Sequence, residues 1–101
     1  MTRSKFYIKQ GILTGFELTG HSGAGHSGND IVCAAVSSAA FMTVNTITEI
    51  MGVPAEIIER EGYLKVKLSI GGAKRCQALL EGFHLHLTEL QKQYPHNIKV
   101  I

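Results

Sequence analysis

The chain has 101 residues, of which 45% are hydrophobic and 18% charged, a composition typical of a globular domain and unlike that of a disordered segment. Its net charge of +2 is too small to predict nucleic-acid binding, which usually requires a strongly basic stripe. Residues 1–10 lack the apolar run and cleavage site of a signal peptide, and no stretch reaches the roughly 18 uninterrupted apolar residues of a membrane span. We therefore expect one cytoplasmic domain over residues 1–101, with no membrane partner and no direct nucleic-acid partner.

The first elements expected are two strands joined by a tight turn. Phe6 and Ile8 alternate with lysines, and residues 12–18 alternate in the same way after the turn Gln10-Gly11. A period of two directs one side of each strand towards a core and the other towards water. An N-terminal β-hairpin is therefore predicted.

A glycine-rich segment follows this hairpin. It holds four glycines within nine positions, at Gly20, Gly23, Gly25 and Gly28. Glycine allows backbone conformations that other residues avoid, so we expect a loop that can close over a bound peptide and exclude water.

The same segment contains a literal G-x-G-x-x-G over residues 23–28, between a predicted strand and a predicted helix. A dinucleotide-binding loop would occupy this position, but it requires a parallel strand–helix–strand unit. The strands here pair as hairpins, Asp30 would place a negative charge beside any phosphate, and no lysine or arginine lies nearby. We therefore do not expect phosphate binding.

A long helix is predicted over residues 31–51. Asp30 is expected to cap it, because a carboxylate accepts hydrogen bonds from the unpaired amides of a first turn. Gly52 followed by Pro54 forms a typical stop signal. Residues 34–40 are small on every side, and such a helix is usually buried on more than one face. In a chain this short, one of the neighbouring faces could belong to a second subunit.

The second half repeats the order of hairpin and helix. Residues 57–58 open a third strand, residues 61–62 form a turn, and residues 64–70 alternate strictly as a fourth strand. The glycine pair at residues 71–72 is expected to end that strand.

Apolar residues at helical spacing from Cys76 to Tyr94 then predict a second long helix, which Pro95 ends. Residues 98–101 could form a short terminal strand. The order is ββαββα, so we expect an α+β fold with two layers, in which a mostly antiparallel sheet from two hairpins is covered by two helices.

Cys33 is the first candidate for chemistry. With Asp30 as the cap it would be the third helical residue, where backbone amides and the helix dipole stabilise a thiolate and can hold an oxyanion. The alternative is a packing role, because free cysteine commonly behaves as a small buried hydrophobe. Cys76, on the apolar stripe of the second helix, is assigned that packing role. Without an export signal, we expect reduced thiols rather than a disulfide.

His21, at the junction of strand and loop, is the candidate base. A nucleophilic thiol needs a base within hydrogen-bonding reach, and a loop that folds back could bring this imidazole to Cys33. His26 is a rival in the same loop that we assign mostly to solvent. Ser37, one helical turn after Cys33, could hydrogen-bond the thiolate or the imidazole, or simply pack. Asp30 fits a helix cap better than the third member of a triad.

His84 and His86 lie close together in the sequence, as metal ligands often do, but their expected positions on a helix argue against a metal site. Residues two apart point to nearly opposite faces, so the two imidazoles cannot bind one ion together. Cys76 alone does not supply the further ligands that zinc requires. We expect surface or rim histidines, and neither a metal nor another cofactor.

Two runs of sequence together resemble the signature of the ribosomal-processing cysteine protease family. The first is Gly20-His21-Ser22-Gly23, and the second is Gly28-Asn29-Asp30-Ile31-Val32-Cys33-Ala34-Ala35-Val36-Ser37. In that family a glycine-histidine-small-glycine turn, a loop and a G-x-D-I-V-C-A-A-x-S helix start recur together. The N-terminal hairpin, the turn at residues 61–63 and the closing helix also fall where that family has them, so the resemblance covers essentially the whole chain.

The resemblance implies a cytosolic bacterial endopeptidase, commonly a homodimer, that works through a Cys–His dyad without a cofactor. The implied substrate is the precursor of large-subunit ribosomal protein twenty-seven, whose N-terminal extension is removed. The nucleophile falls on Cys33, the general base on His21, and supporting positions on Asp30 and Ser37. Two alternatives stay open: a non-catalytic dimeric module that binds the ribosome or a ribosomal protein, with Cys33 a packing residue, and a thiol hydrolase of small-molecule esters.

Overall fold

The computed structural model describes residues 1–20 and 27–101, and within residues 27–30 it describes the backbone alone. Five strands and three α-helices make up this part of the chain, together with one π-helical turn. Their bounds are β1 Thr2–Lys9, β2 Ile12–Thr19, α1 Ser27–Asn45, η1 Thr46–Ile50, β3 Glu56–Arg60, β4 Tyr63–Lys67, α2 Ile70–Arg75, α3 Gln77–Gln93 and β5 Ile98–Val100.

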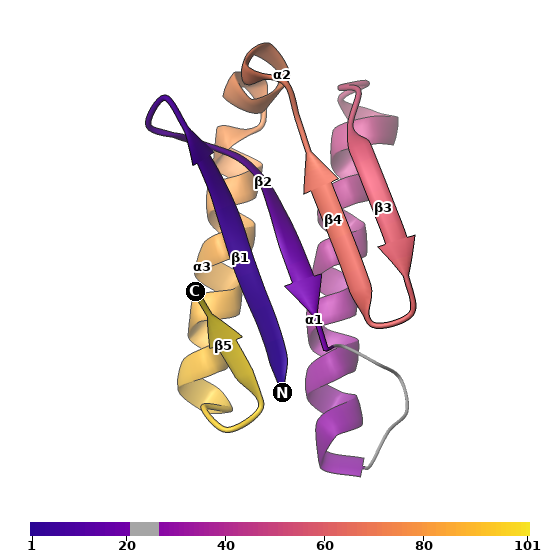
Figure 1. Cartoon of the computed structure of the whole chain (residues 1–101), viewed down its shortest axis with the longest axis vertical. Helices are drawn as coiled ribbons and strands as arrows, with labels where there is room; N and C mark the ends of the chain where they lie inside the picture. Colours follow the sequence, from indigo (N-terminus) through magenta and orange to yellow (C-terminus); the bar gives the residue numbers. More distant parts are fainter. Residues whose placement is uncertain (21–26) are drawn as a thin grey trace.

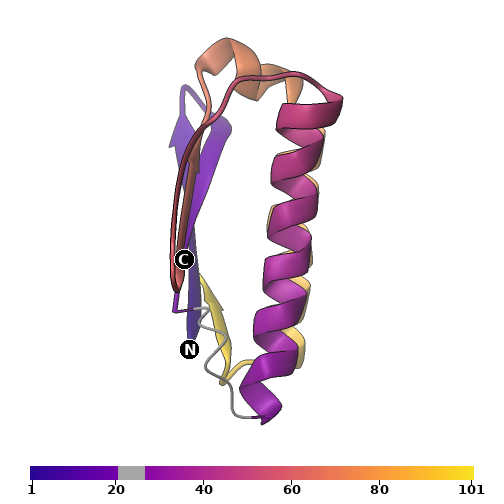
Figure 2. The ribbon, with the colours of Figure 1, turned by 90° about the vertical axis from the view of Figure 1, so that its right-hand side faces the viewer.

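The strands form one sheet in the order β3-β4-β2-β1-β5 (Figure 1). All neighbours pair antiparallel except β1 and β5, which run parallel. The helices α1 and α3 lie side by side on one face of this sheet, so the molecule has two layers (Figure 2). The predicted α+β class, the two hairpins and the mostly antiparallel sheet are confirmed, and the terminal strand exists as β5.

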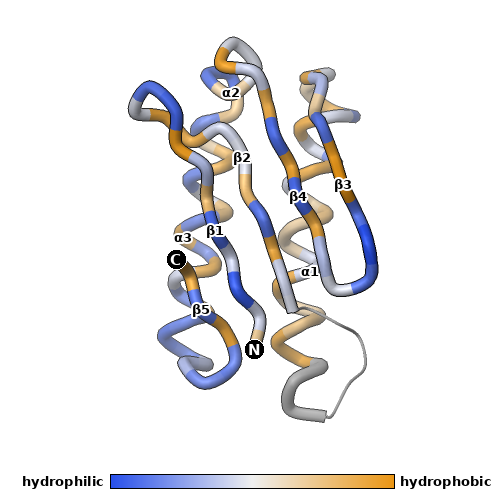
Figure 3. The backbone as a smooth tube through the Cα atoms, viewed as in Figure 1, coloured by the Kyte–Doolittle hydropathy of each residue, from blue (hydrophilic) through white to orange (hydrophobic). Residues whose placement is uncertain are grey.

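The core lies between the sheet and the helices. Strand residues that face the helices, such as Phe16 and Val66, are fully buried, as are Val36 of α1 and Leu80 of α3. Each buried side chain of this size contributes roughly 1.5–3 kcal/mol relative to exposure. The hydropathy of the residues explains this core. Hydrophobic and hydrophilic residues alternate along the strands, whereas α1 is predominantly hydrophobic (Figure 3).

The hairpin turns follow from their residue types. Gln10 and Gly11 have positive φ angles of 53° and 79°, as a two-residue turn that matches the strand twist requires. Gly62, in the turn between β3 and β4, has a φ of 72°. The predicted turns at both places are confirmed.

The fourth strand is shorter than predicted. It ends at Lys67, and Ile70 with both following glycines belongs to the short helix α2. The cause is local: the hydroxyl of Ser69 accepts a hydrogen bond from the amide of Gly72 at 3.1 Å and so caps a helix start. The alternation through residue 70 therefore gave a wrong strand end, because a serine cap outweighed it.

The first helix begins earlier and ends differently than predicted. It starts at Ser27, so Asp30 is its fourth residue and not its cap. At its far end the helix widens into η1, where the amide of Met51 donates to the carbonyl of Thr46 at 2.8 Å. The hydroxyls of Thr43 and Thr48 donate to carbonyls four residues earlier, a pattern that bends helices.

Candidate functional site

Cys33 lies on the side of α1 that faces the start of β1. Its thiol is half-buried, and the sulfur lies 3.9 Å from the hydroxyl oxygen of Thr2. Thr2 itself is buried, and its amide donates to the carbonyl of Asn97 at 2.9 Å. A hydroxyl held by the sheet therefore touches the sulfur, which is a contact that sequence reasoning missed because Thr2 lies outside every motif.

The position of Cys33 within α1 changes the expected electrostatics. With the helix starting at Ser27, Cys33 is the seventh helical residue and not the third. The amides without a helical partner lie at the start of a helix, here at residues 27–29, and the dipole effect fades beyond the first turn. The expectation that Cys33 lies in the first turn of the helix is therefore wrong.

The end of β2 lies close to Thr2. Gly20 has a φ of 80°, and a Cβ at this position would collide with the carbonyl oxygen of Met1 and come within 3.8 Å of the Cα of Thr2. The amide of Gly20 also donates to the carbonyl of Gly62 at 3.0 Å. Two constraints, positive φ and close backbone approach, thus require glycine here. The chain leaves the sheet at the end where Cys33 touches Thr2.

His21 itself lies outside the described residues, as do Gly23, Gly25 and His26. The role of His21 as base, and the roles of Gly23, Gly25 and His26 in the loop, stay predictions. Gly28 lies in the first turn of α1 and so not in the loop to which the sequence assigned it.

Ser37 lies one turn after Cys33 on α1 and is half-buried. This agrees with the expected placement on the same side of the helix. Asp30 is placed by its backbone only, in the turn of α1 that precedes Cys33.

Cys76 differs from Cys33 in its burial and in its surroundings. It lies between α2 and α3, is buried, and its sulfur contacts the sulfur of Met51 at 3.9 Å. Burial raises the pKa of the Cys76 thiol, against a smaller opposing effect of Arg75. Both cysteines are free, so the packing role assigned to Cys76 and the expectation of reduced thiols agree with the structure.

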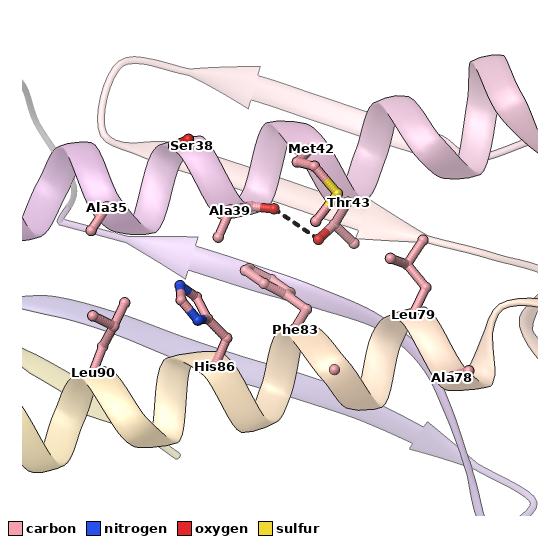
Figure 4. A pocket seen from close by; sticks show the side chains of 11 residues that line it. Ala35, Ser38, Ala39, Met42, Thr43, Ala78, Leu79, Phe83, His86 and Leu90 are labelled. Carbon is pink, nitrogen blue, oxygen red and sulfur yellow. Dashed lines mark hydrogen bonds between the residues drawn. The ribbon is translucent and has the colours of Figure 1, made fainter.

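An apolar groove of about 650 Å³ lies between α1 and α3 (Figure 4). Ala35, Met42, Leu79 and His86 are among its lining residues. Ala35 is two positions from Cys33, so the two side chains point to nearly opposite sides of α1. The groove is therefore separate from the thiol.

The two neighbouring histidines of α3 lie on different sides of that helix. His86 lines the groove, whereas the ring of His84 packs edge-on against Phe6 with centroids 4.7 Å apart. The prediction that they cannot share one ion agrees with this placement. Within residues 1–20 and 27–101, no group of three or more His, Cys, Asp or Glu side chains could hold a metal ion.

The exposed face of the sheet carries a second polar cluster. Glu17 accepts hydrogen bonds from the hydroxyl of Tyr63 at 2.8 Å and from that of Tyr7 at 3.1 Å. Burial and the bond to Glu17 raise the pKa of Tyr7 to about 12. The same bonds, chiefly that from Tyr63, lower the pKa of Glu17. No pattern in the sequence predicts this cluster, because its members come from three different strands.

One helical segment, Ile31–Ile50, is long and apolar enough to cross a membrane by length and composition. Its mean hydropathy is 1.6, and 33% of it is buried inside the protein. The core helix of a soluble protein passes the same test, and this segment packs on the sheet through Val36 and Ala40.

Comparison with known proteins gives consistent results. A family model described as cysteine protease Prp matches residues 1–99. The ribosomal processing cysteine protease Prp of Bacillus subtilis strain 168 is 32% identical over 97 residues, which cover 90% of this chain and 86% of that protein.

Solved structures share the fold over nearly the whole chain. The crystal structure of SMU.848 from Streptococcus mutans is 36% identical with a TM-score of 0.85, and the match covers 99% of this chain and 91% of that one. The ribosomal processing protease Prp from S. aureus, solved in complex with a substrate peptide, is 23% identical with a TM-score of 0.89 and coverage of 100% and 98%.

Proposed function

The chain belongs to the cysteine protease Prp family, and we propose that it cuts peptide bonds with Cys33 as the nucleophile and His21 as the general base. The observation that carries this proposal is the joint placement of two motif ends at one edge of the molecule. Gly20, directly before His21, lies against Met1, and the next residue, Thr2, touches the sulfur of Cys33. The residue before the proposed base and the proposed nucleophile therefore lie at the same end of the sheet, which supports pairing them.

The chemistry is acyl transfer through a covalent intermediate. His21 takes the proton of the Cys33 thiol, and the thiolate forms a C–S bond to the scissile carbonyl carbon. The C–N bond then breaks as His21 returns the proton to the leaving amine. Water, deprotonated by His21, hydrolyses the thioester and releases the acid product with the free thiol.

The oxyanion needs donors that the helical ladder does not use. Cys33 is the seventh residue of α1, so its own amide lies beyond the unpaired first turn. We assign the oxyanion donors to the amides of residues 27–29, which precede Cys33 in the same helix and which the helical ladder does not use. Asp30 and Ser37, one turn before and one turn after the thiol, are proposed as supporting residues.

The proposed substrate is the precursor of large-subunit ribosomal protein twenty-seven, cut after its N-terminal extension. Two findings support a substrate of this class: the Bacillus subtilis relative is named a ribosomal processing protease, and the S. aureus structure holds a substrate peptide. Gly23 and Gly25 would let the loop close over the bound peptide, with Gly20 as its fixed end on the sheet. We expect the protein to work in the cytoplasm, where ribosomal proteins are made.

Incubation of the purified protein with this precursor, followed by mass spectrometry of the products, tests the proposal. Cys33→Ala and His21→Ala are each expected to abolish cleavage, while Cys76→Ala, which removes the other thiol, retains it. Circular dichroism of each variant checks that the fold persists. Undiminished cleavage by the Cys33→Ala protein would contradict the assignment of the nucleophile.

The alternative functions make different predictions in the same experiments. If the chain were a non-catalytic ribosome-associated module, the precursor would stay intact, and alkylation of Cys33 by iodoacetamide would follow an ordinary thiol pKa of about 8.5. Alkylation that persists well below neutral pH supports the peptidase. Turnover of small esters without cleavage of the precursor would indicate a thiol hydrolase of another kind.

We also propose that the protein is a homodimer. The segment Ile31–Ile50 is largely apolar, but only 33% of its most apolar window is buried within one chain, and Phe41 and Met42 on it are exposed. A second copy that covers the helical layer would bury them. Met42→Glu is expected to shift the mass measured by light scattering from dimer to monomer, whereas Ile8→Glu, on the hairpin away from the helices, leaves it unchanged.

A further inference from the structure

The face of the sheet opposite the helices has a composition of its own. Strand register fixes which side chains share this face, because residues directly opposite each other in paired strands point the same way. One row across the sheet reads Lys5, Glu17, Lys65 and Ile58. The row below reads Lys99, Arg3, Thr19, Tyr63 and Arg60, and the row above reads Tyr7, Gly15, Lys67 and Glu56.

Charge is concentrated on this face. It carries six of the ten Lys and Arg residues of the chain but only two of its eight Asp and Glu residues. The face therefore has a charge of +4, although the whole chain has only +2. Our expectation that no nucleic acid binds directly rested on net charge, which hides this separation. A basic face is the usual electrostatic footprint of a nucleic-acid-binding protein.

Two aromatic rings lie among these cations and are held in place. Both tyrosine hydroxyls donate to the one carboxylate of Glu17, which fixes the rings of Tyr7 and Tyr63 on either side of it. The guanidinium of Arg60 lies 4.6 Å from the ring centroid of Tyr63, and the amine of Lys67 lies 5.3 Å from that of Tyr7. Rings and guanidinium planes in fixed positions are surfaces on which nucleobases stack.

The face is also open. Both long helices cover the other side of the sheet, and no described helix crosses this one (Figure 2). Gly15 stands between Tyr7 and Lys67 in its row, so no side chain rises between the ring and the ammonium group. An open surface that carries positive charges, aromatic rings and a guanidinium plane matches a single-stranded nucleic acid, which has phosphates and unpaired bases.

We propose that this open face of the sheet binds single-stranded RNA, with Lys5, Lys65 and Lys67 on the phosphates and Tyr7 and the Arg60–Tyr63 pair under bases. An acidic peptide would use the charges but would leave the rings and the guanidinium plane without a stacking partner. The choice of RNA over DNA rests on the proposed function, because a protease of ribosomal precursors meets ribosomal RNA. Binding to the face itself does not depend on catalysis.

Fluorescence anisotropy with a labelled single-stranded RNA of about ten nucleotides tests the proposal. The logarithm of the association constant should fall against the logarithm of salt concentration with a slope of roughly −0.7 for each phosphate contacted. Lys5→Glu and Lys65→Glu are each expected to weaken binding about tenfold at low salt. Lys74→Glu makes the same change of charge on α2, outside this face, and should change affinity less than about twofold.

Two further variants separate stacking and charge. Tyr7→Leu should weaken RNA binding by at least about fivefold, because one stacked base is lost, but should leave binding of inorganic polyphosphate unchanged. Glu17→Gln removes the only carboxylate in the middle of the face and should tighten RNA binding.

Several outcomes would overturn the proposal. Equal weakening by Lys74→Glu and Lys65→Glu would mean that only overall charge matters. Tighter binding of poly-glutamate than of RNA would identify an acidic protein as the partner, and binding only to vesicles with anionic lipids would identify a membrane surface. Cleavage of the precursor peptide by the Lys65→Glu protein should match the wild type, so failure of RNA binding and failure of the peptidase assignment are distinguishable.

Discussion

The two faces of the sheet differ although they are built from the same strands. On β1, Thr2 and Ser4 face the helices and are buried, while Arg3 and Lys5, which alternate with them, face water. The buried face supplies the core and the contact to Cys33, and the open face gathers charge. Stability and the proposed catalytic site therefore depend on one face, whereas the proposed RNA partner depends on the other.

The two faces are expected to differ most in how much their aromatic side chains contribute to the free energy of unfolding. Phe83 of α3 packs on the buried face, with its ring 4.8 Å from that of Phe16 and 5.7 Å from that of Phe6. Phe83→Ala is expected to lower the free energy of unfolding by about 3–5 kcal/mol, measured by urea denaturation. Tyr7→Ala removes an aromatic ring from the open face and should cost much less, because that ring is partly hydrated already. Equal losses would show that the open face is covered in solution.

A smaller effect is expected from the hydroxyl that touches Cys33. Thr2→Val keeps the shape of the side chain but removes the contact to the sulfur, which would no longer stabilise a thiolate. We expect kcat/KM for the precursor peptide to fall about tenfold, the size of one hydrogen bond to a charged group. The position of Thr2 marks it as a positioning residue, so the pH dependence of kcat/KM should move as well.

Ser4 provides the matched control for Thr2. It lies on the same strand and the same face, is also buried, and its hydroxyl has no hydrogen-bond partner among the described residues. Ser4→Ala should leave kcat/KM unchanged and should not destabilise the fold, because an unsatisfied buried hydroxyl is removed. A loss of activity in Ser4→Ala equal to that in Thr2→Val would mean that the strand responds to any change of packing.

The smallest effect expected is on the ionisation of Tyr7, which lies on the open face. Tyr7 has a pKa raised from 10.0 to about 12, first through burial and then through the bond to Glu17, and ultraviolet titration should detect its late ionisation. The pKa of Glu17 is lowered from 4.5, chiefly by the bond from Tyr63. Glu17→Gln should move the midpoint of Tyr7 back towards 10. An unchanged midpoint would mean that burial alone holds it.

The shifted pKa values of Tyr7 and Glu17 make the stability of the fold depend on pH. A raised pKa stabilises the fold below the unfolded value of 10.0, and this stabilisation is lost as pH rises through about 12. A lowered pKa stabilises the fold above 4.5, and this is lost as pH falls. The cluster therefore contributes fully between about pH 4.5 and 10, and urea midpoints of the wild type and Glu17→Gln should converge outside that range.

Periodicity predicted most of the fold. The alternation around Phe6, the strand at Leu64 and the helical stripe that includes Leu80 and Leu87 all fall where expected, since each pattern reflects burial on one side. Local backbone structure explains the two wrongly predicted element boundaries. A serine cap at Ser69 started α2 inside an alternating run, and the backbone at Ser27 entered the helix before Asp30.

The candidate site was predictable in part. Motif spacing identified Cys33 and Gly20, and the structure places them at the same end of the sheet. Thr2 could not be predicted, because its approach to Cys33 depends on how β1 lies beneath α1. Neither could the charge of the open face, since its lysines come from β1, β4 and β5 and gather only when these strands pair.

The parallel pairing of β1 with β5 has a consequence for the order of events during synthesis. The amide of Thr2 donates to the carbonyl of Asn97, and the amide of Ile101 donates to the carbonyl of Ser4, so β5 holds β1 in place. The residue that touches the thiol thus gains this support only once residues 97–101 have been made. The contact between Thr2 and Cys33 therefore depends on a pairing between segments far apart in the sequence, which forms late in synthesis.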